Sequence, residues 1–148
     1  MSIMQVFFVC LAGIASSAWV GDLAGRVGRR KVLWAMILVM LAGVALTLPQ
    51  SLWAIVAGIA VLTFGFFGAH SVASSWIGRR ALHAKAQASS LYLFAYYVGG
   101  SVIGSVGGLF WSRMGWNGVA ALVGALLLTA LAIALRLARL EPIAAATP

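Results

Sequence analysis

His70 is the only ionisable side chain well inside a long apolar stretch of this 148-residue chain. Ionisable groups in such stretches are rare and often mark a substrate or proton path, and a histidine titrates near neutral pH. Tyr92 and Tyr96 stand four residues apart, so they share one helix face and could line the same cavity. The structural alternative is a neutral core histidine satisfied by nearby serines, with tyrosines at a membrane interface. Those serines are Ser71, Ser74 and Ser75.

A second candidate for chemistry is the segment GDLAGRVGRRKVL, residues 21–33, which holds four of the ten Lys and Arg residues. Glycine permits positive φ and a close approach of backbones. Arginine presents a planar fork of donors to a carboxylate or to helix C-terminal carbonyls. The segment, in which Asp22 is the only acid, therefore predicts a tight polar loop that can latch one helix end against another. The simpler alternative is a basic loop that only sets membrane orientation.

No residue pattern indicates catalysis or a cofactor. The two acidic residues, Asp22 and Glu141, lie at the edges of the apolar stretches. No His/Cys cluster has the spacing of a metal site, and neither a Ser/His/Asp set nor a phosphate-binding loop is evident. We therefore expect no enzyme activity, no cofactor and no metal.

The composition indicates that membrane helices position these residues. Hydrophobic residues make up 64% of the chain and charged residues 8%, against about 45–50% and about 25% in soluble domains. The mean hydropathy is +1.07. The net charge of +8 does not indicate nucleic-acid binding, because the basic residues separate apolar runs long enough to span a bilayer. The lipid bilayer is thus an expected partner, and nucleic acid is not.

Five apolar segments reach the roughly 17 to 25 residues of a membrane helix. They cover residues 3–20, 32–48, 52–77, 88–111 and 118–137. We therefore expect an all-α fold, an integral membrane bundle of five helices in one transmembrane domain, residues 1–140. A short cytoplasmic tail, residues 141–148, follows it.

The basic residues predict the orientation of the bundle. The four connections carry four, zero, three and one Lys or Arg, and the end of the fifth segment carries two. Connections rich in Lys and Arg face the cytoplasm, so the N-terminus is expected outside and the C-terminus inside. Tryptophans near the segment ends fit this topology as interfacial anchors. They are Trp19, Trp34, Trp53, Trp76, Trp111 and Trp116.

Residues 21–33 resemble the signature loop of the major facilitator superfamily. That pattern runs Gly, any, Leu, small, Asp, Arg, any, Gly, Arg, Lys or Arg, any, any, Leu. The matching residues are Gly21, Leu23, Ala24, Arg26, Gly28, Arg29, Arg30 and Leu33. Gly25 departs from the pattern, since the family has an Asp there that takes part in a cytoplasmic latch; Asp22 is a candidate substitute. The resemblance implies a cytoplasmic gating loop made by Gly21, Asp22, Leu23, Arg26, Gly28, Arg29 and Arg30.

The resemblance also implies a place in the family fold. Its loop follows the second helix of each six-helix half, so the chain would supply helices two to six of one half. The stretch LYLFAYYVGGSVIGSVGGLFWSRMGW resembles the eleventh helix of bacterial drug- or sugar-efflux transporters and favours the C-terminal half, about helices 8–12. The implied function is secondary active transport of a small solute across the bacterial inner (plasma) membrane, as efflux, by rocking of two bundles around a midplane site.

A stripe of small residues lies in the fourth apolar segment, where Gly100, Gly104 and Gly108 recur every four residues beside Gly107. Such spacing lets another membrane helix come close. The stripe predicts either static helix packing or a sliding surface used in alternating access.

Two further interpretations stay open, because the resemblance covers fewer helices than one six-helix bundle. One is a truncated or split transporter that needs the missing transporter helices, in cis or in trans. The other is a membrane scaffold that binds helices through the glycine stripe. In both cases the chain would lack independent transport.

Overall fold

The computed structural model describes residues 3–49, 51–81 and 84–139, and the secondary structure in them is helical. The helices are α1 (Ile3–Val27), α2 (Arg29–Thr47), α3 (Leu52–Arg80) and α4 (Lys85–Arg139). Within these described residues, α2, α3 and α4 are long and apolar enough to cross a membrane. The all-helical class is therefore confirmed, with three candidate membrane spans.

The helices extend past the apolar segments into the charged residues. α1 continues beyond residue 20 to Val27 and α2 begins at Arg29, so Gly28 alone joins them. Gly28 has a φ of 105°, a conformation that glycine adopts without a steric cost. The prediction of a loop in residues 21–33 is therefore wrong, since Gly28 is the one residue of this segment outside the two helices. Charged side chains can stay hydrated at the end of a membrane helix while the backbone remains helical.

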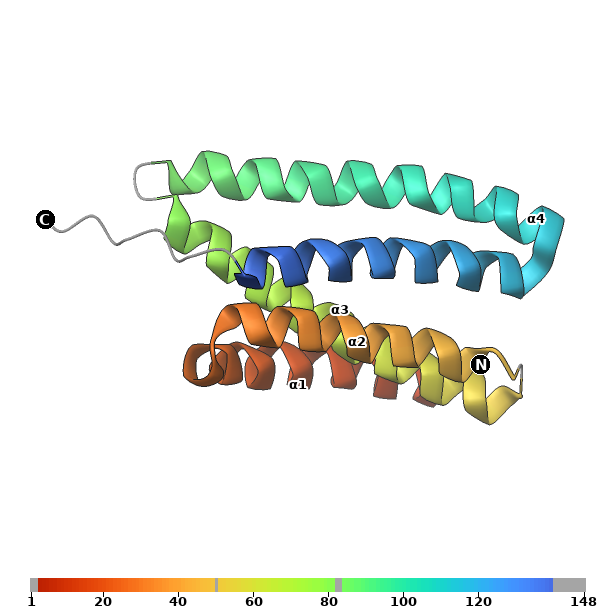
Figure 1. Ribbon diagram of the computed structural model, residues 1–148. Helices are drawn as coiled ribbons and strands as arrows, with labels where there is room; N and C mark the ends of the chain where they lie inside the picture. The colour runs from red at the N-terminus through yellow and green to blue at the C-terminus, as the bar shows by residue number, and fades with distance from the viewer. Residues whose placement is uncertain (1–2, 50, 82–83, 140–148) are drawn as a thin grey trace, which may run out of the picture.

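α4 reverses direction at Gly115, where φ is 61° and ψ is −149° (Figure 1). The helix assigned across this break has 55 residues, far more than the roughly 20 that cross a bilayer. The break divides α4 into a first limb, residues 85–114, and a second limb, residues 116–139. These limbs contain the fourth and fifth apolar segments of the sequence.

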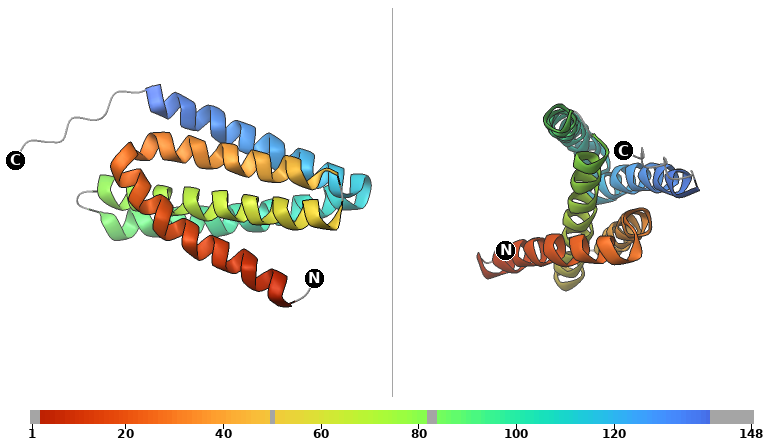
Figure 2. Two further views of the ribbon diagram at one scale, coloured as in Figure 1. Left: turned by 90° about the horizontal axis from the view of Figure 1, so that it is seen from below. Right: turned by 90° about the vertical axis from the view of Figure 1, so that its left-hand side faces the viewer.

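α3 contacts each of the other three helices. Seen along the bundle, it leans from the first limb of α4 toward the pair formed by α1 and α2 (Figure 2). The second limb of α4 lies against α2. α4 is thus held to the rest of the bundle by α3 and by α2.

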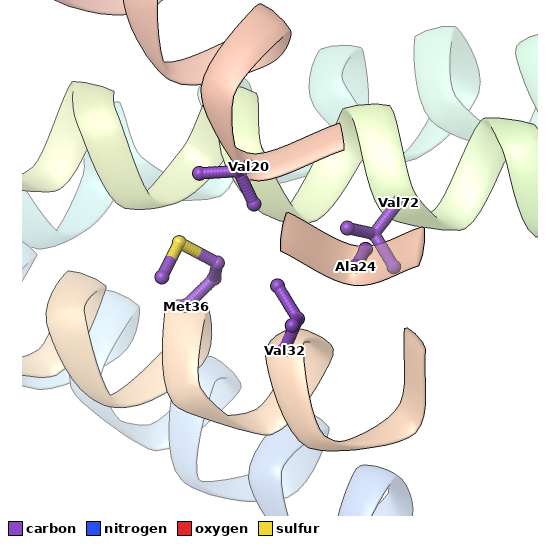
Figure 3. Close-up of a cluster of buried hydrophobic side chains, with 5 residues drawn as sticks. All are labelled: Val20, Ala24, Val32, Met36 and Val72. Carbon is purple, nitrogen blue, oxygen red and sulfur yellow. The ribbon is translucent and has the colours of Figure 1, made fainter. Parts of the chain in front are cut away.

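Two buried apolar clusters hold these helices together. The first joins α1, α2 and α3, and its side chains converge between the three helices (Figure 3). It contains Val20, Ala24, Val32, Met36 and Val72. The second joins α2 to the second limb of α4 through Ile37, Leu127 and Ala134. Many large apolar side chains outside these clusters stay exposed, including Trp53 at 79%, as expected where lipid is the solvent.

Glycines allow α2 and α3 to pack closely. A Cβ added to Gly43 would lie 2.5 Å from the backbone nitrogen of Leu62, and one on Gly58 would lie 2.7 Å from the carbonyl oxygen of Gly43. Further along α3, Gly65 is crowded by the side chain and backbone of α2, and Gly68 by side chains of both α1 and α2. Small residues of this kind bring membrane helices into backbone contact.

The basic residues gather at one end of the bundle. The α1–α2 junction, the end of α3 and both the start and the end of α4 lie together there, whereas the end of α2, the start of α3 and the break in α4 lie at the other end (Figures 1 and 2). The described basic residues at the first end are Arg26, Arg29, Arg30, Lys31, Arg79, Lys85, Arg136 and Arg139. Arg113, next to the break in α4, is at the other end. The helix ends rich in Lys and Arg, which alternate along the sequence with ends poor in them, thus lie at one end of the bundle, and the poor ones lie at the other.

Candidate functional site

The apolar residues of segment 21–33 belong to the first buried cluster. Ala24 is 3% exposed, and Leu23 and Leu33 pack around the cluster. The small residue at position 24 leaves room for Val72 of α3 to pack against α1 and α2 (Figure 3). This part of the motif therefore holds three helix ends together.

The acid of the motif pairs within its own helix. Arg26 Nη2 lies 2.9 Å from Asp22 Oδ2, one turn apart on α1, and the two side chains are 76% and 64% exposed. Asp22 thus does not connect two helices here. A contact between helix ends is made instead by Arg30, whose guanidinium carbon lies 6.0 Å from the ring centroid of Trp76 on α3.

His70 forms a hydrogen bond with Tyr92, so the structure brings together two residues that the sequence proposes for a substrate or proton path. Tyr92 Oη lies 2.8 Å from His70 Nδ1. His70 belongs to α3 and Tyr92 to the first limb of α4, and both side chains are half-buried. The bond therefore links α3 to the first limb of α4.

Two further rings complete what we call the His70 cluster: Phe66, His70, Tyr92 and Tyr96. The ring of Tyr96 has its centroid 5.1 Å from that of His70, and Phe66 stacks on His70 at 6.1 Å with 18° between the ring planes. Phe66 is four residues before His70, as Tyr92 is before Tyr96, so each pair occupies one helix face. Phe66 was not predicted from the sequence, although its spacing from His70 could have identified it.

The serines expected to satisfy His70 bind elsewhere. Ser71 Oγ donates to the carbonyl oxygen of Ser17 at 3.1 Å and so connects α3 to α1. Ser74 and Ser75 donate to carbonyl oxygens one turn back in α3. Tyr92 is the hydrogen-bond partner that the structure gives His70, so the expectation that serines would fill this role is wrong.

The His70 cluster combines a polar pair with an aromatic wall. A phenol and an imidazole can exchange donor and acceptor roles as the imidazole changes its tautomer or gains a proton. Aromatic faces attract cations and apolar rings. Within the described residues there is no group of three or more His, Cys, Asp or Glu side chains that could hold a metal. The arrangement therefore suits proton exchange or contact with an organic solute.

The glycine stripe faces open space. A Cβ added to Gly100, Gly104, Gly107 or Gly108 would meet no atom within 4 Å in the part of the chain that the structure describes. The stripe is on the first limb of α4, away from the α2–α3 contact where other glycines are crowded. Its packing role stays a prediction, one that needs a helix from outside these residues.

A bundle of long apolar helices with one basic end defines a multi-pass membrane protein. Residues 1–148 match the family model described as Major Facilitator Superfamily. The chain belongs to this superfamily, whose members are membrane transporters and not enzymes. The superfamily that segment 21–33 predicted is thereby confirmed.

Several bacterial proteins are similar to this chain. An "Uncharacterized MFS-type transporter YybF" from Bacillus subtilis is 52% identical over 134 residues, which is 90% of this chain and 33% of that protein. An "Uncharacterized transporter" from Buchnera aphidicola is 39% identical over 87% of this chain and 31% of its own length. The "Inner membrane transport protein YnfM" of Escherichia coli is 61% identical over 51% of this chain and 18% of its own. This chain thus spans about a third of its curated relatives or less, and no solved structure matches it.

Proposed function

We propose that this chain takes part in secondary active transport of a small solute across the bacterial inner membrane, in the efflux direction. Family membership supports transport, and the printed name of the Escherichia coli relative supports the inner membrane. The resemblance of residues 91–116 to the eleventh helix of efflux transporters supports the direction and the C-terminal half.

The proposed topology has five membrane crossings, made by α1, α2, α3 and the two limbs of α4. The reversal at Gly115 supports two crossings within α4. The gathering of basic residues at one end supports a cytoplasmic position for that end. The N-terminus is then outside and the C-terminus inside.

The observation that carries the proposed site is the bond of 2.8 Å between Tyr92 Oη and His70 Nδ1. A polar pair is costly in a membrane unless its members satisfy each other. A solute or proton that enters the His70 cluster would compete for this bond. The hydrogen bond between His70 and Tyr92 can therefore break when a solute or proton binds in the cluster. The rings of Tyr96 and Phe66 form the surface against which the solute packs.

The test uses proteoliposomes that contain the chain and an internal pH dye, with an imposed proton gradient and a panel of organic cations and sugars. We expect solute-dependent proton movement that falls at least ten-fold in His70→Gln and several-fold in Tyr92→Phe. Tyr97→Phe is the matched control, because Tyr97 is 67% exposed and outside the cluster. Unchanged flux and pH dependence in both cluster variants would refute the proposed path.

The open face of the glycine stripe favours a second candidate, in which this chain needs helices that it does not contain. We propose that Gly100, Gly104 and Gly108 receive a helix from a longer polypeptide or from a partner chain. The test is to co-express this chain with the part of the Bacillus relative that lies outside the matched region. Flux only in the pair supports a split transporter, capture without flux supports a scaffold, and flux by the chain alone supports an independent carrier.

A further inference from the structure

An open cavity of about 650 Å³ lies at the basic end of the bundle. Its lining includes Arg29, Arg30 and Lys31, from the first turn of α2, together with Trp34 and Trp76. We call it the basic cavity. Arg30 lies against the ring of Trp76, which places a guanidinium at the boundary between the charged and aromatic walls.

No acidic side chain of the described residues pairs with Arg29 or Lys31 in the basic cavity. Asp22 is the single acid among them, and it pairs with Arg26 on α1. The first turn of α2 contains no acid, and Gly28 provides no side-chain cap for its backbone N–H groups. A helix N-terminus already carries partial positive charge, so basic side chains there raise the potential further. An anion in this cavity would be stabilised by both sources.

A second cavity of about 510 Å³ shares Trp76 with the basic cavity and has an almost wholly apolar wall. Leu33, Ile77 and Leu137 line it, one from each of α2, α3 and α4. Leu33 is one helical turn further into the bundle than Arg29. We call it the apolar cavity. The basic cavity and the apolar cavity are thus both lined by Trp76.

We propose that these two cavities bind one anionic phospholipid, with its phosphate at Arg29, Arg30 and Lys31 and an acyl chain beside Trp76 in the apolar cavity. A free phosphate would use the basic cavity alone and would leave the apolar cavity without a role. A zwitterionic lipid would bind less tightly than an anionic one, because the cation of its own head group would lie near the three basic side chains. A basic pocket between helix ends is a setting in which anionic head groups are recognised. The proposal does not depend on what the chain transports.

The test measures lipid retention by native mass spectrometry of the detergent-purified chain. The probes are dioleoylphosphatidylglycerol, dioleoylphosphatidylcholine and inorganic phosphate. We expect phosphatidylglycerol to bind at least ten-fold more tightly than phosphatidylcholine. Arg29→Gln should weaken it about five-fold, since each basic residue near an anionic head group contributes about 1 kcal/mol. Arg113→Gln, which removes the same charge at the opposite end, is the matched control and should change nothing.

The apolar cavity has its own variant, Ile77→Asn, which should weaken phosphatidylglycerol binding without affecting phosphate. Arg29→Lys keeps the charge and should bind nearly as well as the parent chain, which separates loss of charge from loss of fold. Equal binding of the two lipids, or equal losses in Arg29→Gln and Arg113→Gln, would overturn the proposal. Displacement of phosphatidylglycerol by millimolar phosphate would overturn it too, since the site would then be one for free phosphate.

Discussion

Trp116 Nε1 donates a hydrogen bond of 3.0 Å to Thr47 Oγ1. Thr47 is 1% exposed, and its hydroxyl donates in turn to the carbonyl oxygen of Val44 at 2.7 Å. Trp116 directly follows the break at Gly115, and Thr47 ends α2. This pair therefore fixes the start of the second limb of α4 against α2, at the end of the bundle opposite the basic residues.

Trp116→Phe should lower the free energy of unfolding by about 1 kcal/mol, because it removes one hydrogen bond while an aromatic ring remains. The measurement is unfolding in mixed micelles followed by circular dichroism. Trp53→Phe makes the same chemical change at a residue that is 79% exposed and should have no measurable effect. Equal losses in the two variants would show that this bond does not hold the second limb.

Gly43→Ala should destabilise the bundle by about 1–3 kcal/mol, the usual range for overpacking. Its new Cβ would lie 2.5 Å from the nitrogen and 2.8 Å from the Cα of Leu62. These are backbone atoms, so α2 and α3 would have to move apart. The same unfolding assay reports the loss.

Gly104→Ala is the matched control for Gly43→Ala, because its Cβ would meet nothing within 4 Å in the described residues. It should stabilise the chain by up to about 1 kcal/mol, since alanine has the higher helix propensity. If the stripe receives a partner helix, this variant should instead weaken capture of that partner. A destabilised Gly104→Ala chain on its own would contradict the open face seen here.

Gly28→Ala should cost about 1–3 kcal/mol, the usual cost of holding a non-glycine residue at an unfavourable φ. Gly28 is the one residue between α1 and α2 and has a φ of 105°. Gly25→Ala, three residues earlier in helical backbone with no atom within 4 Å of its Cβ, should be neutral or stabilising. A benign Gly28→Ala would mean that the junction can adopt another backbone conformation.

Asp22→Asn should change the free energy of unfolding by no more than about 0.5 kcal/mol. Its ion pair with Arg26 is exposed and spans one helical turn, and such pairs contribute about 0.3–0.5 kcal/mol. A double-mutant cycle with Arg26→Gln isolates the pair. A coupling several times larger would show that Asp22 contacts another helix when the protein is in its membrane, as the family latch would require.

The site was partly readable from the sequence. The four-residue spacing of Tyr92 and Tyr96 placed them on one face, and His70 was conspicuous as an ionisable group in an apolar segment. That His70 meets Tyr92 could not be predicted from the sequence, because it depends on how α3 leans toward the first limb of α4.

The crowded glycines between α2 and α3 were also not predicted from the sequence. Gly58 and Gly65 are seven residues apart and lie on one helix face. The sequence instead predicted close helix packing at Gly100–Gly108, where the glycines are more densely spaced but have no neighbour among the described residues.

The helix ends show why local patterns fail at boundaries. A run of Arg and Gly at residues 25–31 is typical of a loop, yet the structure keeps all but Gly28 helical. Helical backbone satisfies its own hydrogen bonds, so it persists while long basic side chains reach water. Gly115 illustrates the converse, since one glycine at a φ of 61° reverses the chain where the sequence predicted a connection of several residues.

The sequence by itself determined that the chain lies in a lipid bilayer and that it is a helical membrane protein. Too few polar residues exist to cover a soluble core, and the apolar runs have bilayer length, so membrane helices follow from composition and spacing alone. Only the tertiary structure decided which helix faces meet. A helix of apolar residues can pack on any side in lipid, because the hydrophobic effect does not distinguish a neighbouring helix from an acyl chain. Close glycine contacts and a few hydrogen bonds make that choice, and they depend on three-dimensional fit that no single segment contains.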